Sequence, residues 1–462
     1  MLVEFRVRNY RSFAEEQVLS MEATRIKRLE QRNTFLAPDG KHRLLHAAAL
    51  YGANASGKSN LVAAIGLMHG LVLRSAREKD ALRNMFTAKA FRLDPALRNQ
   101  PSRFEVTFFQ EGVRYTYGFA IQEHKGRQII DEEWLYAYPH KRRQRWFERR
   151  RQQWSYGPSF KGEKSRLQAM TRPDALFLSV GDLLNHPQLK SVYAWFDERL
   201  AVIPSWIWSP GLFTTDTGQL LNEDTEFRHW VERLLHYADL GIARVEAHKQ
   251  SFRDYLDDRF ATMPQLGEAM LAMVQKLGDP LEPVYRIDIF HQRVDGQWER
   301  FDLDKDESHG TQLLFGAASL LWQALRKPGI LIIDELDKSL HPGLLRLLVL
   351  LFQAPALTPP GAQLVFTTHD TSLLDPTLEP RLFRRDQVWF LEKDKKGASQ
   401  LYSLADFDER EDASFMRRYL NGIYGAVPNL QMWLDSLAYG LISDAETAAT
   451  SETPIPAEVP EA

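Results

Sequence analysis

The segment that most constrains this chain is Gly52–Ser59, GANASGKS, which matches the pattern GxxxxGK[ST]. The apolar run Leu44–Tyr51 precedes it, and the helix-forming segment Asn60–His69 follows it. In such a strand–turn–helix, backbone N–H groups of the glycine turn and the positive end of the helix point at phosphate oxygens. Lys58 can then reach the β- and γ-phosphates of a nucleotide, and the hydroxyl of Ser59 can ligate Mg²⁺. The pattern predicts a nucleotide site at a strand end; a plain glycine turn, the alternative, does not explain a Lys-Ser pair at the helix start.

The bulk composition excludes several classes of protein. At 462 residues the chain is long enough for roughly two to three structural units. Its formal charge of −3 gives no global attraction to nucleic acid or acidic membranes, and the absence of cysteine excludes disulfides and thiolate metal sites. Met1–Arg8 alternates charged and apolar residues, as a strand does and a signal peptide does not. Because no apolar run reaches the roughly 18 residues of a membrane span, we expect a cytoplasmic protein that does not enter a membrane.

A second predicted element of the site is the apolar run Gly329–Glu335, which ends in two acids. A buried parallel strand delivers such acids to the carboxyl edge of a sheet. Asp334 would hold Mg²⁺ through its water shell, and Glu335 would polarise the water that attacks the γ-phosphate. Taken alone, the run also fits a strand end with solvated acids. Beside a phosphate loop, the nucleotide interpretation is favoured.

Three further segments extend this pattern. Leu336–Pro342 resembles the dimer-interface loop that follows the catalytic carboxylate in ABC-type ATPases. Gln363–Asp370 is typical of another buried strand, and His369 near its end can hydrogen-bond the γ-phosphate and register its presence. Upstream, Glu307–Thr311 resembles a degenerate ABC signature, in which a serine, backbone amides and the helix dipole face a phosphate. His309 replaces one glycine of the usual signature, so an ordinary helix cap is the alternative.

The order phosphate loop, signature, acidic strand, interface loop and histidine is that of ABC-type ATPases. Asn9–Phe13, after a first strand, resembles the opening of SMC-like, recombination-repair and OLD-like (overcoming lysogenisation defect) ATPases. The chain is most similar to the bacterial RloA-like ATPases, which are associated with phage defence. The similarity extends over nearly the whole chain and includes Leu176–Val180, Tyr237–Ile242, Arg384–Gln387 and the distinctive Tyr419–Pro428.

This resemblance implies an α/β fold of the ABC-type P-loop NTPase head, a mixed sheet flanked by helices, with an inserted, mainly helical lobe. It implies ATP and Mg²⁺ as ligands, and heads that self-associate around ATP. The residues expected to act are, for catalysis, Glu335 and His369; for ATP binding, Arg11, Gly52, Asn54, Gly57, Lys58, Ser59 and Asn60; for the signature acting in trans, Ser308 and Gly310; and for the metal, Ser59 and Asp334.

The spacing of the motifs predicts one ATPase head divided by an insertion. We expect residues 1–130 to form the N-terminal part of the head with an antiparallel subdomain, 131–300 an inserted hairpin and helical lobe, 301–442 the C-terminal part of the head, and 443–462 a disordered acidic tail. The predicted strands, hairpin and helices in the first two parts are Ser102–Phe109 and Arg114–Ile121, Trp134–Trp154, and Gln188–Leu200, Thr225–Ala238 and Asp254–Leu277. None of the helical segments keeps a heptad repeat, so no long coiled-coil arm is expected.

The densest run of positive charge is Lys141–Arg151, in which basic residues alternate with Trp146 and Phe147 and lead to Trp154. Such a run can grip a phosphate backbone and stack on bases. A solvated hairpin that packs Trp and Phe on its other face is an alternative, and an acidic protein partner is another. All three interpretations stay open at the level of the sequence.

Three classes of function fit these observations. The first is a defence ATPase that senses infection or nucleic acid and controls an effector encoded by a neighbouring gene. The second is a DNA-clamping repair or chromosome-structure ATPase. The third, a transporter motor, is disfavoured by Asn9–Phe13 and by the large insertion. A self-contained nuclease is not expected, because the segment after His369 shows no set of a Glu with Asp-x-Asp.

Overall fold

The computed structural model describes residues 1–79, 81–84, 87–139, 142–205, 214–277, 284–354, 358–410, 413–428 and 434. The predicted acidic tail, residues 443–462, lies outside the described residues. None of the helices in the described ranges combines the length and the apolar character that a bilayer span needs.

A mixed six-stranded sheet forms the centre of the molecule. Its strand order is β11 (Leu200–Ile203), β15 (Ile330–Ile333), β16 (Gln363–Thr367), β5 (Ala47–Tyr51), β17 (Val388–Lys393) and β18 (Ser399–Ser403). The first five strands are parallel, and β18 is antiparallel to β17. β5, β15 and β16 are buried at every position, which is why their sequences are apolar without alternation. The predicted strand 44–51 is therefore two strands, because the short β4 (Arg43–Leu45) pairs with β3 (Thr34–Leu36) instead of joining this sheet.

An antiparallel sheet packs beside the central sheet. Its strand order is β10 (Gln153–Tyr156), β9 (Gln144–Arg150), β8 (Arg127–Tyr138), β7 (Val113–His124), β6 (Ser102–Gln110), β1 (Leu2–Arg8) and β2 (Gln17–Ser20). The predicted hairpin 134–154 is thus part of a continuous meander, and the predicted domain boundary at residue 130 falls inside β8. The division of the chain into domains stays a prediction.

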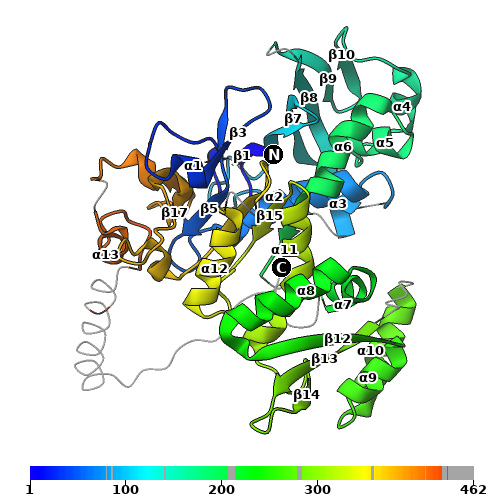
Figure 1. Cartoon of the computed structure of the whole chain (residues 1–462). Coiled ribbons are helices and arrows are strands. Elements are labelled where there is room, and N and C mark those ends of the chain that lie inside the picture. The colour runs from blue at the N-terminus through cyan, green and yellow to red at the C-terminus, as the bar shows by residue number, and fades with distance from the viewer. Residues whose placement is uncertain are drawn as a thin grey trace, which may run out of the picture.

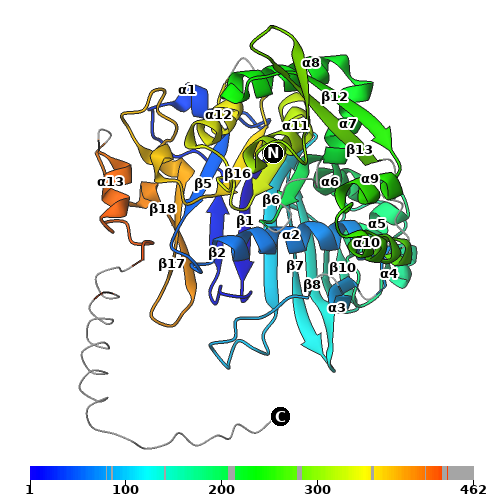
Figure 2. The same cartoon turned by 90° about the horizontal axis from the view of Figure 1, so that it is seen from below.

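Helices fill the space between the two sheets. The helices α2 (Lys58–Arg74), α5 (Phe177–Leu183) and α6 (Pro187–Arg199) share one hydrophobic core with the antiparallel sheet and with one face of the central sheet (Figure 2). The two faces of β5 alternate: Ala48 and Leu50 face this core, whereas Ala47, Ala49 and Tyr51 face a second core. The second core contains α11 (His309–Arg326) and α12 (Pro342–Phe352), so helices cover the central sheet on both faces.

The insertion between β11 and α11 forms a lobe that shares the second core with α11 (Figure 1). Its elements are α7 (Thr214–Glu223), α8 (Thr225–Leu235), the π-helical turn η2 (His236–Leu240), β12 (Ile242–Gln250), α9 (Phe252–Arg259), α10 (Pro264–Leu277), β13 (Val284–Gln292) and β14 (Trp298–Asp302). The predicted helix 254–277 is two helices, because Pro264 has no backbone N–H to donate and begins a new helix. A three-stranded antiparallel sheet, β12–β13–β14, accompanies the helices and was not predicted.

The remaining described elements are short. They are α1 (Glu30–Asn33), α3 (Ala81–Asn84), α4 (Lys164–Met170), α13 (Phe415–Leu420) and the 3-10 turns η3 (Thr371–Leu374), η4 (Arg385–Gln387) and η5 (Leu404–Asp406). The α13 helix contacts η3, which directly follows the end of β16.

Candidate nucleotide-binding site

The predicted phosphate loop connects the carboxyl end of β5 to the first turn of α2. Gly57 precedes the helix with a φ of 116°, and Ala55 has a φ of 63°, so the loop curls tightly. A Cβ on Gly52 would lie 2.4 Å from the carbonyl oxygen of Leu391, and one on Gly57 would lie 2.4 Å from Oγ of Ser399. Both glycines are therefore required by conformation or by close packing.

Lys58 is the first residue of α2 and is only 6% exposed. Its Nζ donates to the carbonyl oxygens of Gly52, at 2.7 Å, and Ala53, at 3.1 Å. Burial lowers the pKa of Lys58, and the charges of Asp334 and other nearby acids oppose that shift. The ammonium group thus lies inside the loop, near acids, and donates to loop carbonyls.

The two predicted acids follow β15 directly. Asp334 is 3% exposed, and its Oδ1 accepts a hydrogen bond from Oγ1 of Thr367 at 2.7 Å. The same Oγ1 accepts the backbone N–H of Glu335 at 2.7 Å. Glu335 has a φ of 56°, a left-handed conformation that costs free energy in a residue with a side chain and needs such support. Thr367, at the end of β16, therefore fixes both carboxylate residues.

His369 lies two residues beyond Thr367, at the same edge of the sheet. Burial lowers the pKa of His369, and the charge of Lys58 lowers it further, whereas Asp337, Glu335 and Asp334 act in the opposite direction. The structure therefore brings the phosphate-loop lysine, both acids of the acidic strand and the histidine to one place. Their catalytic and binding roles stay predictions.

The N-terminal turn packs against the phosphate loop. Nη1 of Arg11 donates to Oδ1 of Asn60 at 3.3 Å, and Nδ2 of Asn60 donates to Oγ of Ser12 at 2.8 Å. The buried Ser399 donates from Oγ to the carbonyl oxygen of Ser56 at 2.6 Å, and the same Oγ lies at hydrogen-bond distance, 2.8 Å, from Oγ of Ser12. Arg11 and Asn60 thus lie together as predicted partners of the loop. Ser399 was not predicted, because an isolated serine in a C-terminal strand gives no sequence signal.

The predicted signature residues lie at the start of α11. Ser308 is the N-cap, and its Oγ accepts the backbone N–H of Thr311 at 3.2 Å. Gly310 is close to the interface loop, since a Cβ there would lie 2.7 Å from the carbonyl oxygen of Ser339. Ser308 therefore acts as an ordinary helix cap within this chain, and its predicted role toward a neighbouring chain is not tested by a single chain. Asn54 and Ser59, the remaining predicted loop residues, are exposed.

A family model described as "AAA domain, putative AbiEii toxin, Type IV TA system" matches residues 47–375. The chain belongs to this AAA family. The matched region includes the phosphate loop, the acidic strand and His369. The chain is therefore a P-loop ATPase of the AAA type, with the predicted mixed sheet flanked by helices. The finer resemblance to RloA-like and OLD-like ATPases stays a prediction.

Solved SMC head structures are also similar to the chain, each over 87% of its length. They are the SmcHead bound to the C-winged helix domain of ScpA (13% identity, TM-score 0.40, 97% of that chain covered), the SMC head domain from Thermotoga maritima (12%, 0.35, 98%), and the Smc head domain with an extended coiled coil bound to the C-terminal domain of ScpA derived from Pyrococcus furiosus (12%, 0.36, 96%). A comparison with curated proteins finds no match.

Outside the region that the AAA family model matches, the late element 419–428 contacts the phosphate loop from behind. The rings of Tyr51 and Tyr419 meet edge to face with centroids 5.6 Å apart, and the hydroxyl of Tyr51 donates to the carbonyl oxygen of Asp370 at 3.0 Å. The hydroxyl of Tyr419 donates to the carbonyl oxygen of Ala426 at 3.1 Å. Burial raises the pKa of Tyr419 to about 12, and a hydrogen bond with the backbone of Gly52 opposes that shift. The element thus joins the phosphate loop to the segment that follows His369.

The basic run 141–151 does not present its aromatic residues to solvent in this AAA protein. Trp146 and Phe147 are buried at 7% and 0% exposure, so neither is available to stack on bases. Arg149 is also fully buried and pairs with Glu133 at 3.3 Å. The structure favours the hairpin that packs Trp146 and Phe147 into the core, and it removes these two rings from the stacking part of the nucleic-acid hypothesis, whereas Trp154 is only half-buried. Lys141 lies outside the described residues.

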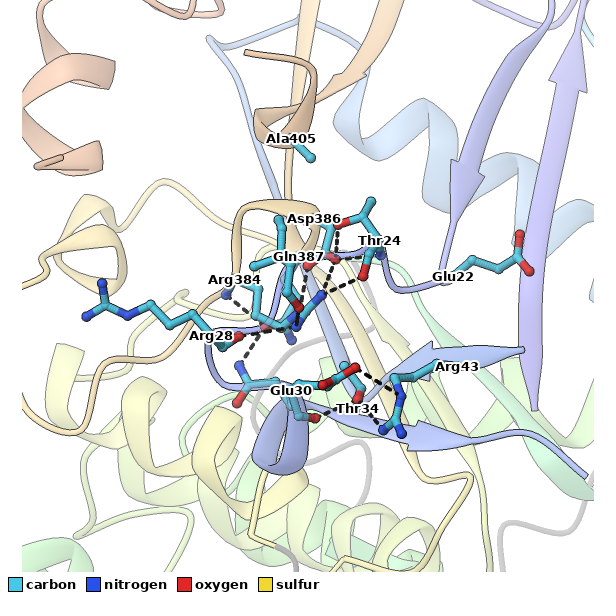
Figure 3. Close-up of polar contacts among 12 residues, drawn as sticks. Glu22, Thr24, Arg28, Glu30, Thr34, Arg43, Arg384, Asp386, Gln387 and Ala405 are labelled. Carbon is cyan, nitrogen blue, oxygen red and sulfur yellow. Dashed lines mark hydrogen bonds and ion pairs between the residues drawn. The ribbon is translucent and has the colours of Figure 1, made fainter. Parts of the chain in front are cut away.

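The segment Arg384–Gln387 is part of the predicted resemblance to RloA-like ATPases. It forms a buried network of hydrogen bonds and an ion pair (Figure 3). The guanidinium of Arg384 pairs with Asp386 at 2.6 Å and donates to the carbonyl oxygens of Ile26, at 2.5 Å, and Thr24, at 3.2 Å. Nε2 of Gln387 donates to the carbonyl oxygen of Ala47 at 2.9 Å, at the start of β5. This segment therefore stabilises the base of the strand that carries the phosphate loop, at the opposite end from the site.

Proposed function

We propose that this ATPase binds and hydrolyses Mg-ATP and uses its nucleotide state as a switch that controls a separately encoded effector in phage defence. The observation that carries the nucleotide part is the meeting of Lys58, Asp334, Glu335 and His369 at the carboxyl edge of one parallel sheet. Ligands of open α/β sheets bind at this edge.

Each group at this edge has a chemical role to fill. The loop amides and Lys58 would bind the β- and γ-phosphates, and Glu335 would orient and polarise the attacking water. His369 would contact the γ-phosphate. Because Thr367 fixes Asp334 and Glu335 through hydrogen bonds, the acids are preorganised before substrate binds.

The oxygen donors near the loop fit Mg²⁺. The hydroxyl of Ser59 and the carboxylate of Asp334 are the ligands that would hold it. Within the described residues, no group of three or more His, Asp or Glu side chains is placed to hold a metal ion. Mg²⁺ is commonly bound by one or two carboxylates together with phosphates and water. When bound, the ion would neutralise charge on the phosphates.

The enzyme part is tested by ATP hydrolysis and nucleotide binding of purified variants. We expect Lys58→Ala to abolish ATP binding. Lys190→Ala, which removes an exposed lysine of α6, is the matched control and should behave as the wild type. ATP binding that survives Lys58→Ala at wild-type affinity would contradict the proposed site.

A dimer of heads is the second part of the proposal. Ser308 and Gly310, at the start of α11, would serve the ATP bound to a neighbouring chain, and the closeness of Gly310 to the interface-loop carbonyl of Ser339 supports this. Sedimentation of Glu335→Gln with and without Mg-ATP tests this. We expect a dimer only with Mg-ATP, and a wild-type ATPase rate that is second order in protein at low concentration. A monomer in both conditions, with full wild-type activity, would reject the dimer.

Control of an effector rests on the resemblance to defence ATPases, and the family description adds the words putative AbiEii toxin and type IV TA system. A shift of a partner from 1:99 to 99:1 release needs about 5.5 kcal/mol of differential binding between nucleotide states. Co-expression with the neighbouring gene and affinity purification in each nucleotide state is the assay, and we expect a complex whose stability depends on nucleotide. If the protein purifies alone in every state and binds duplex DNA with a steep salt dependence, the DNA-clamping function replaces this one.

A further inference from the structure

Asp337, a residue that the sequence patterns did not single out, lies within the candidate site. It belongs to the turn that follows β15, in which Glu335 and Ser339 both have positive φ, at 56° and 60°. The side chains of Leu336 and Leu340 are buried and anchor this turn in the second core. The resulting curl brings the Asp337 carboxylate back to the end of β16.

One oxygen of this carboxylate accepts a hydrogen bond from the main chain of His369. Oδ2 of Asp337 accepts the backbone N–H of His369 at 3.1 Å. The residues are 32 positions apart in the chain, so this bond joins the interface loop to the segment that carries the imidazole. The same turn lies beside the signature, because a Cβ on Gly310 would meet the carbonyl oxygen of Ser339 at 2.7 Å. A single turn therefore contacts both the histidine and the signature helix.

The other oxygen of Asp337 is buried and has no hydrogen-bond partner among the residues that the structure describes. Glu133, the buried acid under the antiparallel sheet, differs in this respect, because Arg149 and Phe177 donate to one of its oxygens and Tyr117 and Leu178 donate to the other. A buried polar atom without a partner points to a ligand or water that completes it. The charge of Asp337 also acts on Lys58, since it raises the pKa of that lysine and so opposes the effect of burial.

We propose that Asp337 is a positioning residue of the nucleotide site, which fixes the main chain at His369 and so sets the imidazole toward the γ-phosphate. This inference rests on the proposed ATP site. It predicts that loss of the Asp337 bond weakens the discrimination between ATP and ADP, because only ATP has the phosphate that His369 would contact.

The experiment measures dissociation constants for ATP and ADP with the full-length chain and its variants. Asp337→Ala should reduce the preference for ATP over ADP by about tenfold, as His369→Ala should, since a hydrogen bond to a charged group is lost in each. Asp337→Asn should keep most of the preference, because its amide oxygen can still accept the backbone N–H. The double variant Asp337→Ala/His369→Ala should lose no more of the preference for ATP over ADP than either single variant does, as expected for residues that act through one another.

Two controls make the result decisive. Asp375→Ala removes another loop carboxylate, which accepts hydrogen bonds from Thr377 just after η3, and should leave the ATP to ADP ratio unchanged. Thermal unfolding identifies variants that have lost the fold, and Asp337→Asn keeps the test open if Asp337→Ala does not fold.

The outcomes separate this inference from the proposed function. A wild type that binds no ATP, or ATP binding that survives Lys58→Ala, overturns the site itself. If Lys58→Ala abolishes binding but Asp337→Ala keeps the wild-type ratio, the positioning role is wrong. The positioning role would also be wrong if Asp337→Asn and Asp337→Ala lost the ATP preference equally, or if the losses of Asp337→Ala and His369→Ala were additive. Either result would favour a direct effect of the negative charge.

Discussion

Two clusters of buried charge in this molecule differ in how completely their atoms are paired. Under the antiparallel sheet, Glu133 and Arg149 have side chains with 0% exposure and pair at 3.3 Å. Glu133 also accepts hydrogen bonds from the hydroxyl of Tyr117 and from the backbone N–H groups of Phe177 and Leu178, at 2.8–3.1 Å. Every oxygen of this acid has a partner in the chain.

The cluster at the edge of the central sheet is paired less completely. Among the described residues, Nζ of Lys58 donates to loop carbonyls alone, and Oδ1 of Asp337 is buried without a partner. Buried charges that stabilise a fold are paired and hydrogen-bonded internally, because an unpaired one is costly. At the proposed site, a bound nucleotide would supply the missing contacts. The completeness of hydrogen bonding is therefore the property that distinguishes the structural ion pair from the proposed binding site.

The largest expected effect is on the chemistry of the incompletely paired cluster. Glu335→Gln should keep ATP binding and slow hydrolysis by about 10²–10⁴-fold, the usual contribution of a positioned acid–base group. Single-turnover hydrolysis and nucleotide binding measure the two quantities separately. Glu268→Gln, which changes an exposed acid of α10 with 64% side-chain exposure, is the control. Normal turnover in Glu335→Gln would exclude this residue from the mechanism.

The fully paired cluster should respond in stability instead. Arg149→Ala leaves Glu133 buried without its cation and should lower the free energy of unfolding by about 3–5 kcal/mol. Arg150→Ala, the next residue, has a side chain with 76% exposure and should change it by less than about 0.5 kcal/mol. Urea unfolding measures both. A stable Arg149→Ala variant that had instead lost ATP binding would reverse the assignment of the two clusters.

The sequence predicted the central sheet and most of the site because their signals are local. An apolar run followed by acids or by GxxxxGKS encodes both a buried parallel strand and the chemistry at its end. Sheet β12–β14 was missed because strand β12, IARVEAHKQ, is mostly exposed and does not alternate. Arg149 was read as part of a charged surface, since its partner Glu133 is 16 positions away across a hairpin. Ser399 bonds to Ser12 over 387 positions, a distance at which single residues give no pattern.

A smaller effect is expected where the fold supports the loop from a distance. Ser399→Ala removes the hydroxyl that bonds Ser12 and the carbonyl of Ser56, and should weaken ATP binding by roughly threefold to tenfold. Ser403→Ala, in the same strand, removes a buried hydroxyl that accepts the N–H of Ala405 and lies away from the loop. We expect it to lower stability without changing affinity. Equal affinities in the two variants would show that Ser399 serves only the fold.

The smallest expected effect is a pH dependence of the free energy of unfolding. It would indicate that Lys58 serves ligand binding at a cost in stability. Burial lowers the pKa of Lys58 in the folded chain below the ordinary lysine value of 10.5. Between the lowered pKa and 10.5 the unfolded chain binds more protons than the folded chain, so the stability of the wild type should rise with pH across that window. Lys58→Met should remove this part of the slope and raise stability at neutral pH by about 0.5–1 kcal/mol, at the small end of single-residue effects. Urea unfolding between neutral pH and pH 10.5, without nucleotide, measures the slope, with Lys190→Met as the exposed control. If the pH dependence of stability is unchanged in Lys58→Met, the loop does not disfavour the charged form of Lys58 relative to water. The contrast between the two charge clusters would then rest on Asp337 alone.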